Sequence, residues 1–409
     1  MIIKREVLYV FLLAVVQFIH IVDFVVMMPL GPMLMDELSL NPAQFGQLVS
    51  AYTFSAALSA LALSPIADRY PRKNLLLIMM IGFILGTIFC GLSQSFSHLL
   101  FSRIVAGCFG GLLNTIVYSM VTDLVPYERR GKAMGILVSA FSAASILGIP
   151  LGLMLADSFS WQYSFYGIAA FSFLVLIASW RIFPLISILR TPSPWSRVLI
   201  ESYELMKVPI YLKAYGFIFL VAVSVFLVIP FLAPYAVKNM GIANSELKYM
   251  YLLGGTVTLF SGRYLGILTD RLGALKVFQW AVLISTIPVV LFTQAGQTSL
   301  FHYLLLSTFF MVFVSGRMIP CMTLVSEVPR PADRGAFMGI LNAVRSIGSG
   351  VATVVAGMMM TEDAELRILG FDHVGYLSLF VIFLTMIYAL RLSRSMKCVA
   401  PIAGETVSD

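Results

Sequence analysis

The sequence predicts an all-α polytopic membrane protein with twelve transmembrane helices in two pseudo-symmetric six-helix bundles. Composition, recurring apolar stretches and an internal repeat lead to this fold class. The chain has 409 residues, of which 59% are hydrophobic and 11% are charged, against about 25% charged residues in a typical soluble domain. Apolar stretches of about 20 residues, long enough to cross a bilayer as helices, recur along the whole chain. Inside lipid every backbone polar group needs an internal partner, so the spans must be helical.

The apolar stretches are joined by short connections, except for a longer middle segment. In that segment Ser193 precedes Pro194, a helix-start signal, and apolar residues alternate with charged ones. We expect an amphipathic helix that lies on the membrane surface. The expected spans are 7–34, 45–67, 74–94, 98–122, 132–156, 161–182, 213–236, 247–269, 275–294, 299–325, 336–359 and 373–393. The expected units are a first bundle at 1–182, a cytoplasmic linker at 183–212, a second bundle at 213–397 and a tail at 398–409.

The distribution of Lys and Arg predicts the orientation. An even number of spans puts both termini on one side. Loops and span ends on that side carry about 20 basic residues, whereas the opposite loops carry Lys238, Lys248 and Arg367. The positive-inside rule therefore places both termini in the cytoplasm. We expect an integral protein of the bacterial inner membrane.

An internal repeat relates the two halves of the chain. Three motif pairs occur in the same order at offsets of about 200 residues, each at equivalent spans, which indicates two related six-helix units. Parallel repeats of this kind are typical of carriers that bind their ligand near the bilayer midplane. The pairs are Pro29-Leu30-Gly31-Pro32 with Pro230-Phe231-Leu232-Ala233-Pro234, Asp68-Arg69 with Asp270-Arg271, and Arg130-Gly131-Lys132-Ala133-Met134-Gly135 with Arg334-Gly335-Ala336-Phe337-Met338-Gly339.

Several motifs resemble those of the major facilitator superfamily, over essentially the whole chain. The loop after the second span reads Asp68-Arg69-Tyr70-Pro71-Arg72-Lys73, which keeps the family's charges but replaces its glycines by Ser64 and Pro71. Span four carries Arg103-x-x-x-Gly107, similar to the family's fourth-span motif. Span five carries Gly148-Ile149-Pro150-Leu151-Gly152, similar to the exporters' Gly-Pro motif with Ile149 in place of a glycine. The nearest subgroup resembles the twelve-span drug/H⁺ antiporters and the arabinose-efflux-permease-like proteins.

Asp23 is the only carboxylate that the span assignment places deep inside a span. An ionisable group inside the membrane is costly and marks a functional site by default. Burial favours the protonated form of a carboxyl, which would let Asp23 exchange protons near neutral pH. Gln17 and His20 lie on the same helical stripe, and His20 is a second candidate proton carrier. The alternative is that Asp23 only forms a structural ion pair that holds the halves together.

Arg317 and Arg345 are expected near mid-depth in spans ten and eleven. A guanidinium stays charged at physiological pH, so each arginine needs an anion. Because two arginines would face the single buried acid Asp23, the excess positive charge favours a substrate with an anionic group. Alternatively, one arginine pairs with Asp23 and the other reaches water. Asn342 lies three residues before Arg345 and could share its face. Asn114 and Tyr118 in span four are weaker candidates, for which the alternative is an ordinary interhelical hydrogen bond.

The resemblance also assigns roles to charges elsewhere in the spans and at their inner ends. It implies that Arg103 assists proton transfer, unless its side chain extends to water. In the family, charges at the inner ends form ion pairs that close the cytoplasmic side when the carrier opens outward. Such pairs are worth about 0–1 kcal/mol each, enough to bias two nearly balanced states; the alternative is a solvated polar face. The expected gate residues are Asp68, Arg69, Arg72, Asp123, Arg263, Asp270, Arg271, Glu327 and Arg334.

Three functions remain open on this basis: a proton-coupled efflux carrier for a small organic molecule, an importer or facilitator of the same fold, and a non-transporting sensor or scaffold. The resemblance favours the first. We find no phosphate-binding loop, no nucleophile–base constellation and no metal-ligand spacing among the four cysteines, so we expect no enzymatic activity and no cofactor. The expected partners are a small-molecule substrate, protons and membrane lipid, without nucleic acid, and the expected state is a monomer.

Overall fold

The computed structural model describes residues 2–67, 70–126, 129–184, 203–330 and 333–399, and it is almost entirely helical. The surface helix expected from Ser193 onwards falls outside the described residues, as do Asp68 and Arg69 of the expected gate. Two short strands, β1 (Thr361–Glu362) and β2 (Ile368–Leu369), pair antiparallel in the last connection. They were not expected from the sequence.

Each expected span corresponds to one helix or to a broken pair of helices. In the first half these are α1 (Ile2–Val26), α2 (Gly31–Glu37), α3 (Pro42–Ala67), α4 (Arg72–Gly91), α5 (Phe96–Leu124), α6 (Arg130–Ala143), α7 (Ile149–Ser158) and α8 (Trp161–Ile182). In the second half they are α10 (Pro209–Phe226), α11 (Leu232–Lys238), α12 (Leu247–Leu272), α13 (Ala274–Thr293), α14 (Leu300–Gly316), α15 (Met318–Ser326), α16 (Arg334–Met359) and α17 (Phe371–Val399).

Eleven segments of the described chain are long and apolar enough to cross a membrane. The twelfth expected span is α12, which has 26 residues. It carries four charged residues, Lys248, Arg263, Asp270 and Arg271. Its length matches that of its neighbours, and it packs against α13 and α14. The twelve-helix architecture therefore holds, with one polar span.

Four of the spans are broken near proline residues, which cannot donate a backbone hydrogen bond. The turn between α1 and α2 contains Pro29, and a π-helical turn at Ala144–Gly148 precedes Pro150. A 3₁₀ turn around Pro230 separates α10 from α11. The break at Arg317 lies three residues before Pro320. The nitrogen of Pro320 cannot donate the helical hydrogen bond to the carbonyl of Gly316, the last residue of α14. The sequence assignment treated these spans as continuous, because helical periodicity survives across a short break.

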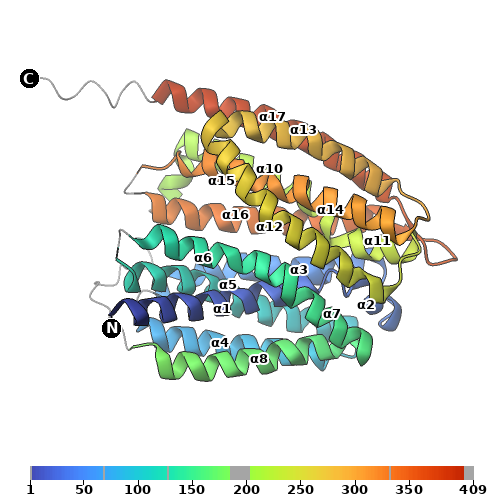
Figure 1. The fold of residues 1–409 in the computed structure, drawn as a ribbon, viewed down its shortest axis with the longest axis horizontal. Coiled ribbons are helices and arrows are strands. Elements are labelled where there is room, and N and C mark those ends of the chain that lie inside the picture. Colours follow the sequence, from blue (N-terminus) through green and yellow to red (C-terminus); the bar gives the residue numbers. More distant parts are fainter. Residues whose placement is uncertain (1, 68–69, 127–128, 185–202, 331–332, 400–409) are drawn as a thin grey trace, which may run out of the picture.

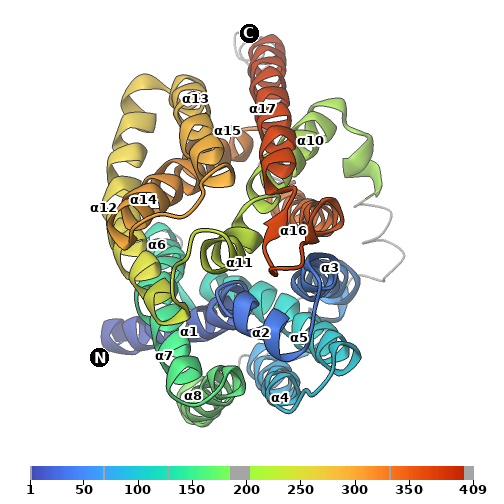
Figure 2. The same cartoon turned by 90° about the vertical axis from the view of Figure 1, so that its right-hand side faces the viewer.

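The two halves lie side by side, with α1–α8 on one side and α10–α17 on the other (Figures 1 and 2). They meet where α3 packs along α16 and where α7 and the π-helical turn pack on α12. The start of α1 and the end of α17 lie at one end of the molecule, hereafter the terminal end (Figure 1). At the other end α2 packs against α11 (Figure 2), and we call this the α2–α11 end.

Candidate functional site

Asp23 forms a fully buried ion pair with Arg103. Nη1 of Arg103 donates to Oδ2 of Asp23 at 3.0 Å, and both side chains have 0% exposure. The hydroxyl of Thr87 donates to the other carboxylate oxygen at 3.2 Å. The pair therefore joins α1 to α5 within the first half. Asp23 thus does form the ion pair that the alternative interpretation expected, but the pair does not hold the two halves together, and Arg103 does not extend to water.

Arg103 also lies over the ring of Tyr52 in α3, with 4.4 Å between the guanidinium carbon and the ring centroid. Its Nε and Nη2 atoms have no hydrogen-bond partner, and the aromatic face provides part of the missing stabilisation. The Tyr52 hydroxyl lies 2.8 Å from Nδ1 of His20. Asp23, Arg103, Tyr52 and His20 thus form one cluster, in which Arg103 contacts Tyr52 through the ring face and His20 is half-buried.

Glycines in α5 make this arrangement possible. A side-chain carbon at Gly107 would lie 2.6 Å from the backbone oxygen of Tyr52, and one at Gly110 would lie 2.4 Å from the Tyr52 hydroxyl. Such distances are too short for any side chain, so these positions let α3 approach α5 closely. The Arg103-x-x-x-Gly107 motif therefore has a structural explanation: the glycine brings Tyr52 to the position where Arg103 stacks on it.

Gln17 and Asn114 form a second polar contact in the first half. Nε2 of Gln17 donates to Oδ1 of Asn114 at 2.9 Å, which joins α1 to α5. Oε1 of Gln17 is buried without a partner. Asn114 therefore forms an interhelical hydrogen bond, which was one of the two expectations for this residue. Gln17 retains a free hydrogen-bond acceptor.

Arg317 and Arg345, the two arginines expected near mid-depth in the second half, have no carboxylate partner among the described residues. Arg317, at the break between α14 and α15, is 1% exposed. Its Nε donates to the carbonyl of Val314 at 3.3 Å, and its Nη2 has no partner. Arg345 in α16 is half-buried and lies near Tyr118 of α5 and Cys321 of α15. Neither arginine pairs with Asp23, which Arg103 already neutralises.

Asn342 lies one turn before Arg345 in α16 and is half-buried. Its side chain forms no hydrogen bond with any other described residue. Tyr118 likewise forms no side-chain hydrogen bond within the described chain, so it is not an ordinary interhelical hydrogen-bonding residue. Both side chains therefore retain free donors and acceptors close to the boundary between the halves.

At the terminal end, Nε of Arg72 lies 3.2 Å from Oδ2 of Asp123. This pair joins α4 to α5 within the first half, so in this conformation it does not connect the halves. Within the described part of the second half, the other expected gate residues are exposed and form no ion pair. They are Arg263, Asp270, Arg271, Glu327 and Arg334. A cross-half latch at this end therefore stays a prediction for the opposite conformation.

The halves are joined by charge at the α2–α11 end instead. Lys238 of α11 lies 3.4 Å from Asp36 of α2 and 2.7 Å from Glu362 of β1, with its side chain 7% exposed. Nearby, Lys248 of α12 lies 4.0 Å from Asp157 of α7. These are the cross-half ion pairs of the described residues, and both lie at this end. The structure is therefore closed at the α2–α11 end.

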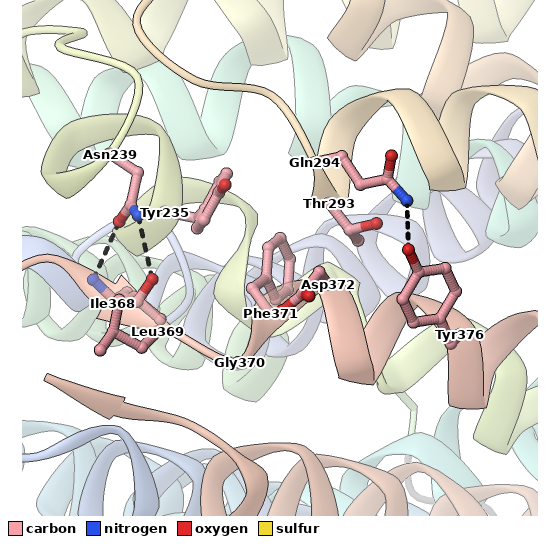
Figure 3. A pocket seen from close by; sticks show the side chains of 10 residues that line it. All are labelled: Tyr235, Asn239, Thr293, Gln294, Ile368, Leu369, Gly370, Phe371, Asp372 and Tyr376. Carbon is pink, nitrogen blue, oxygen red and sulfur yellow. Dashed lines mark hydrogen bonds between the residues drawn. The ribbon is translucent and has the colours of Figure 1, made fainter.

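A pocket of about 380 Å³ lies at the same end, away from the buried charges (Figure 3). Asn239 exchanges two hydrogen bonds with the backbone of Ile368, and Gln294 donates to the hydroxyl of Tyr376 (Figure 3). Because these polar groups bond to one another and the pocket contains none of the expected site residues, it is not our candidate substrate site.

The sequence analysis missed Tyr52, Thr87, Asp36 and Glu362, and it treated Lys238 only as an outer-loop charge. Tyrosine and threonine are common inside spans, so Tyr52 and Thr87 carry no specific sequence signal. A signal did exist for Asp36 and Lys238. They are 202 residues apart, the offset that also relates Pro32 to Pro234, so opposite charges occupy equivalent positions in the two repeats.

Comparisons with known proteins agree with this architecture. The family model described as Major Facilitator Superfamily matches residues 13–202 and 214–400. The uncharacterised MFS-type transporter YceJ of Bacillus subtilis is 28% identical over 350 residues, which cover 84% of this chain and 87% of that protein. A probable sugar efflux transporter of Mannheimia succiniciproducens is 22% identical over 351 residues, covering 83% and 82% of the two chains.

Among solved structures, a bacterial homologue of the human lysosomal transporter Spinster, in an inward-facing and occupied conformation, superposes with a TM-score of 0.72. The match covers 94% of this chain and 96% of that one at 18% identity. At this level of identity the likeness shows the fold alone.

Proposed function

Since the chain belongs to the Major Facilitator Superfamily, whose members are transporters and not enzymes, we propose that it exports a small organic molecule in exchange for protons. In this proposal both termini lie in the cytoplasm of a bacterium, in the inner membrane, and the monomer is the transporting unit. The α2–α11 end then faces outward, and the structure corresponds to a state closed on that side.

The buried Asp23–Arg103 pair carries the proposal of proton coupling. A coupling group must hold a proton in one state and release it in another, and a carboxylate removed from water is suited to both. Protonation of Asp23 would remove the charge that holds Nη1 of Arg103. Because the pair joins α1 to α5, this change would alter the packing of two central helices. His20 offers the proton a route toward a more accessible position.

Export is favoured over import by two weaker observations. Gly148 and Gly152, from the motif that resembles that of exporters, pack against Val22 and Val26 of α1, the helix that carries Asp23. One relative is named as a probable sugar efflux transporter. An importer or facilitator remains the second candidate, since fold alone does not set direction. A sensor or scaffold would have no need for a desolvated ion pair in one half and buried arginines without a carboxylate partner in the described part of the other.

We further propose that the substrate carries an anionic group. The support is the charge balance of the buried residues: Arg103 neutralises Asp23, which leaves Arg317 and Arg345 without a carboxylate partner among the described residues. A lipophilic cation would have to bind near these two positive charges.

Transport by purified protein in liposomes tests the function. A pH-sensitive dye trapped inside reports proton movement when organic anions, sugars or lipophilic cations are added under an imposed pH gradient. We expect substrate-dependent proton flux in the wild type and none in Asp23→Asn, which mimics the protonated carboxyl. Glu365→Gln, an exposed loop substitution, serves as the control and should transport normally. Wild-type flux in Asp23→Asn would rule out coupling at this residue, and substrate movement without any proton flux would favour a facilitator.

A further inference from the structure

We propose that Arg317 and Arg345 form the site for the anionic group of an organic substrate, at the break between α14 and α15 beside Cys321. This inference rests on the proposed transport function and adds the position and the chemistry of the binding site. It assigns proton exchange to the first half of the chain and substrate charge to the second.

The two halves differ in how their buried charges are balanced. The repeat offset of 202 places Val225 at the position equivalent to Asp23, so the second half has no counterpart of the buried acid. Every described carboxylate of the second half lies at a helix end or in a connection between helices. They are Glu246, Asp270, Glu327, Asp333, Glu362, Asp363, Glu365 and Asp372. The positive charges of Arg317 and Arg345 are therefore not neutralised from within their own half.

Arg317 is the more deeply buried of the two arginines. With 1% exposure and a single hydrogen bond to the carbonyl of Val314, its guanidinium leaves most of its five N–H donors unused. The carboxyl end of α14 carries a partial negative charge, which offsets only part of the cost of burial. A carboxylate or phosphate that accepts two parallel N–H bonds matches this guanidinium in geometry and in charge.

Arg345 supplies the second charge and the link to the other half. Arg317 lies one turn before the buried Cys321, and Arg345 of α16 lies near the same side chain. Arg345 also lies near Tyr118 of α5, in the first half. An anion held by Arg345 would therefore lie between the halves, with the Tyr118 hydroxyl as a further donor. An anion bound at such a position would contact both halves of the carrier.

Thermal unfolding of the purified full-length protein with matched probes tests the site. The probes are naphthalene-2-carboxylate, phenyl phosphate and the neutral naphthalene-2-carboxamide, with sodium chloride and sodium phosphate at matched ionic strength. A ligand that binds only the folded state raises the unfolding temperature with its concentration. We expect both organic anions to stabilise the wild type, and the amide and the inorganic salts to have little effect.

Variants assign the effect to the two arginines. Arg317→Gln and Arg345→Gln should each weaken the apparent affinity for the carboxylate at least about tenfold, as expected for a lost charged hydrogen bond. Arg317→Lys and Arg345→Lys keep the charge but lose the two parallel donors, so they should bind the carboxylate more weakly than the wild type and more tightly than the glutamine variants. They also cover the case in which a glutamine variant does not fold. Arg391→Gln, on an exposed part of α17, is the matched control and should bind like the wild type.

Three results would overturn the proposal: no stabilisation by any organic anion, equal stabilisation by the amide, or unchanged anion affinity in both glutamine variants. Equal stabilisation by inorganic phosphate would show that the arginines bind a simple ion and not an organic substrate. Because binding is measured without a membrane gradient, these outcomes are independent of Asp23. Failure of proton coupling would leave the anion site standing, and the reverse also holds.

Discussion

The Nζ atom of Lys238 lies 3.4 Å from Oδ1 of Asp36, the residue at the equivalent position one repeat earlier. Residues at equivalent positions meet when they lie close to the pseudo-twofold axis that relates the repeats. Gly31 lies close to the same axis, because a side-chain carbon there would lie 2.8 Å from Pro234, the equivalent of its neighbour Pro32. The α2–α11 end is therefore closed by contacts between the repeats themselves, and these contacts must separate if that end opens.

Asp36→Asn should shift the protein toward conformations open at the α2–α11 end. Lys238 would keep Glu362, so the substitution removes only the cross-half contact. Since Asp36 is 52% exposed, the pair is worth no more than about 1 kcal/mol, or roughly a fivefold change in the ratio of the two states. Spin labels at Phe159→Cys and Leu366→Cys, in a background without other cysteines, would report a larger population of long distances.

Arg367→Gln is the control for this measurement, because Arg367 pairs with Glu365 inside one loop. It should leave the distance distribution unchanged. An Asp36→Asn distribution that matches the wild type would show that helix packing alone keeps this end closed.

Substitutions of Asp23 and Arg103 should have strongly non-additive effects on the free energy of unfolding. Removing one partner of a buried ion pair typically costs about 3–5 kcal/mol, because the other charge stays buried without compensation. Arg103→Gln should therefore destabilise the protein markedly, and Asp23→Asn combined with Arg103→Gln should be less destabilised than the sum of the single variants. Thermal or denaturant unfolding of the four proteins in a double-mutant cycle gives the coupling free energy. Additive effects would contradict the pairing.

Gly110→Ala should disturb the link between Tyr52 and His20. The added carbon would lie 2.4 Å from the Tyr52 hydroxyl and 3.0 Å from Nδ1 of His20, so the tyrosine must move. We expect reduced proton-coupled transport together with lower thermal stability. Gly339→Ala is the matched control, because nothing lies within 4 Å of the added carbon, and alanine favours a helix over glycine by up to about 1 kcal/mol. Equal behaviour of the two variants would argue against a role for this contact.

Arg72→Ala and Asp123→Ala should each favour conformations open at the terminal end. The pair fixes the start of α4 to the end of α5, and we expect this fixed arrangement to be what docks on the second half in the opposite conformation. Labelling of cysteines introduced at Gly135 and Gly339 by a membrane-impermeant reagent should become faster in the variants. Arg391→Gln should not change the labelling rate. Rates that match the wild type in Arg72→Ala and Asp123→Ala would rule out the latch.

The sequence by itself determined the fold class, the number of spans, the repeat and the identity of the intramembrane charges. Each rests on a local property of the chain. Hydropathy over about 20 residues identifies a span, a constant offset identifies a repeat, and an ionisable residue such as Asp23 inside an apolar stretch stands out. The eleven apolar spans and α12 follow from this local information.

Only the tertiary structure decided which charges pair. The sequence did not show which arginine pairs with Asp23. The choice of Arg103 depends on packing within the first half, including the close approach of α3 to α5 that Gly107 and Gly110 permit. Hydropathy does not record which face of a helix meets which neighbour. That choice is made by packing between helices distant in sequence, and it leaves Arg317 and Arg345 as the uncompensated charges of the second half.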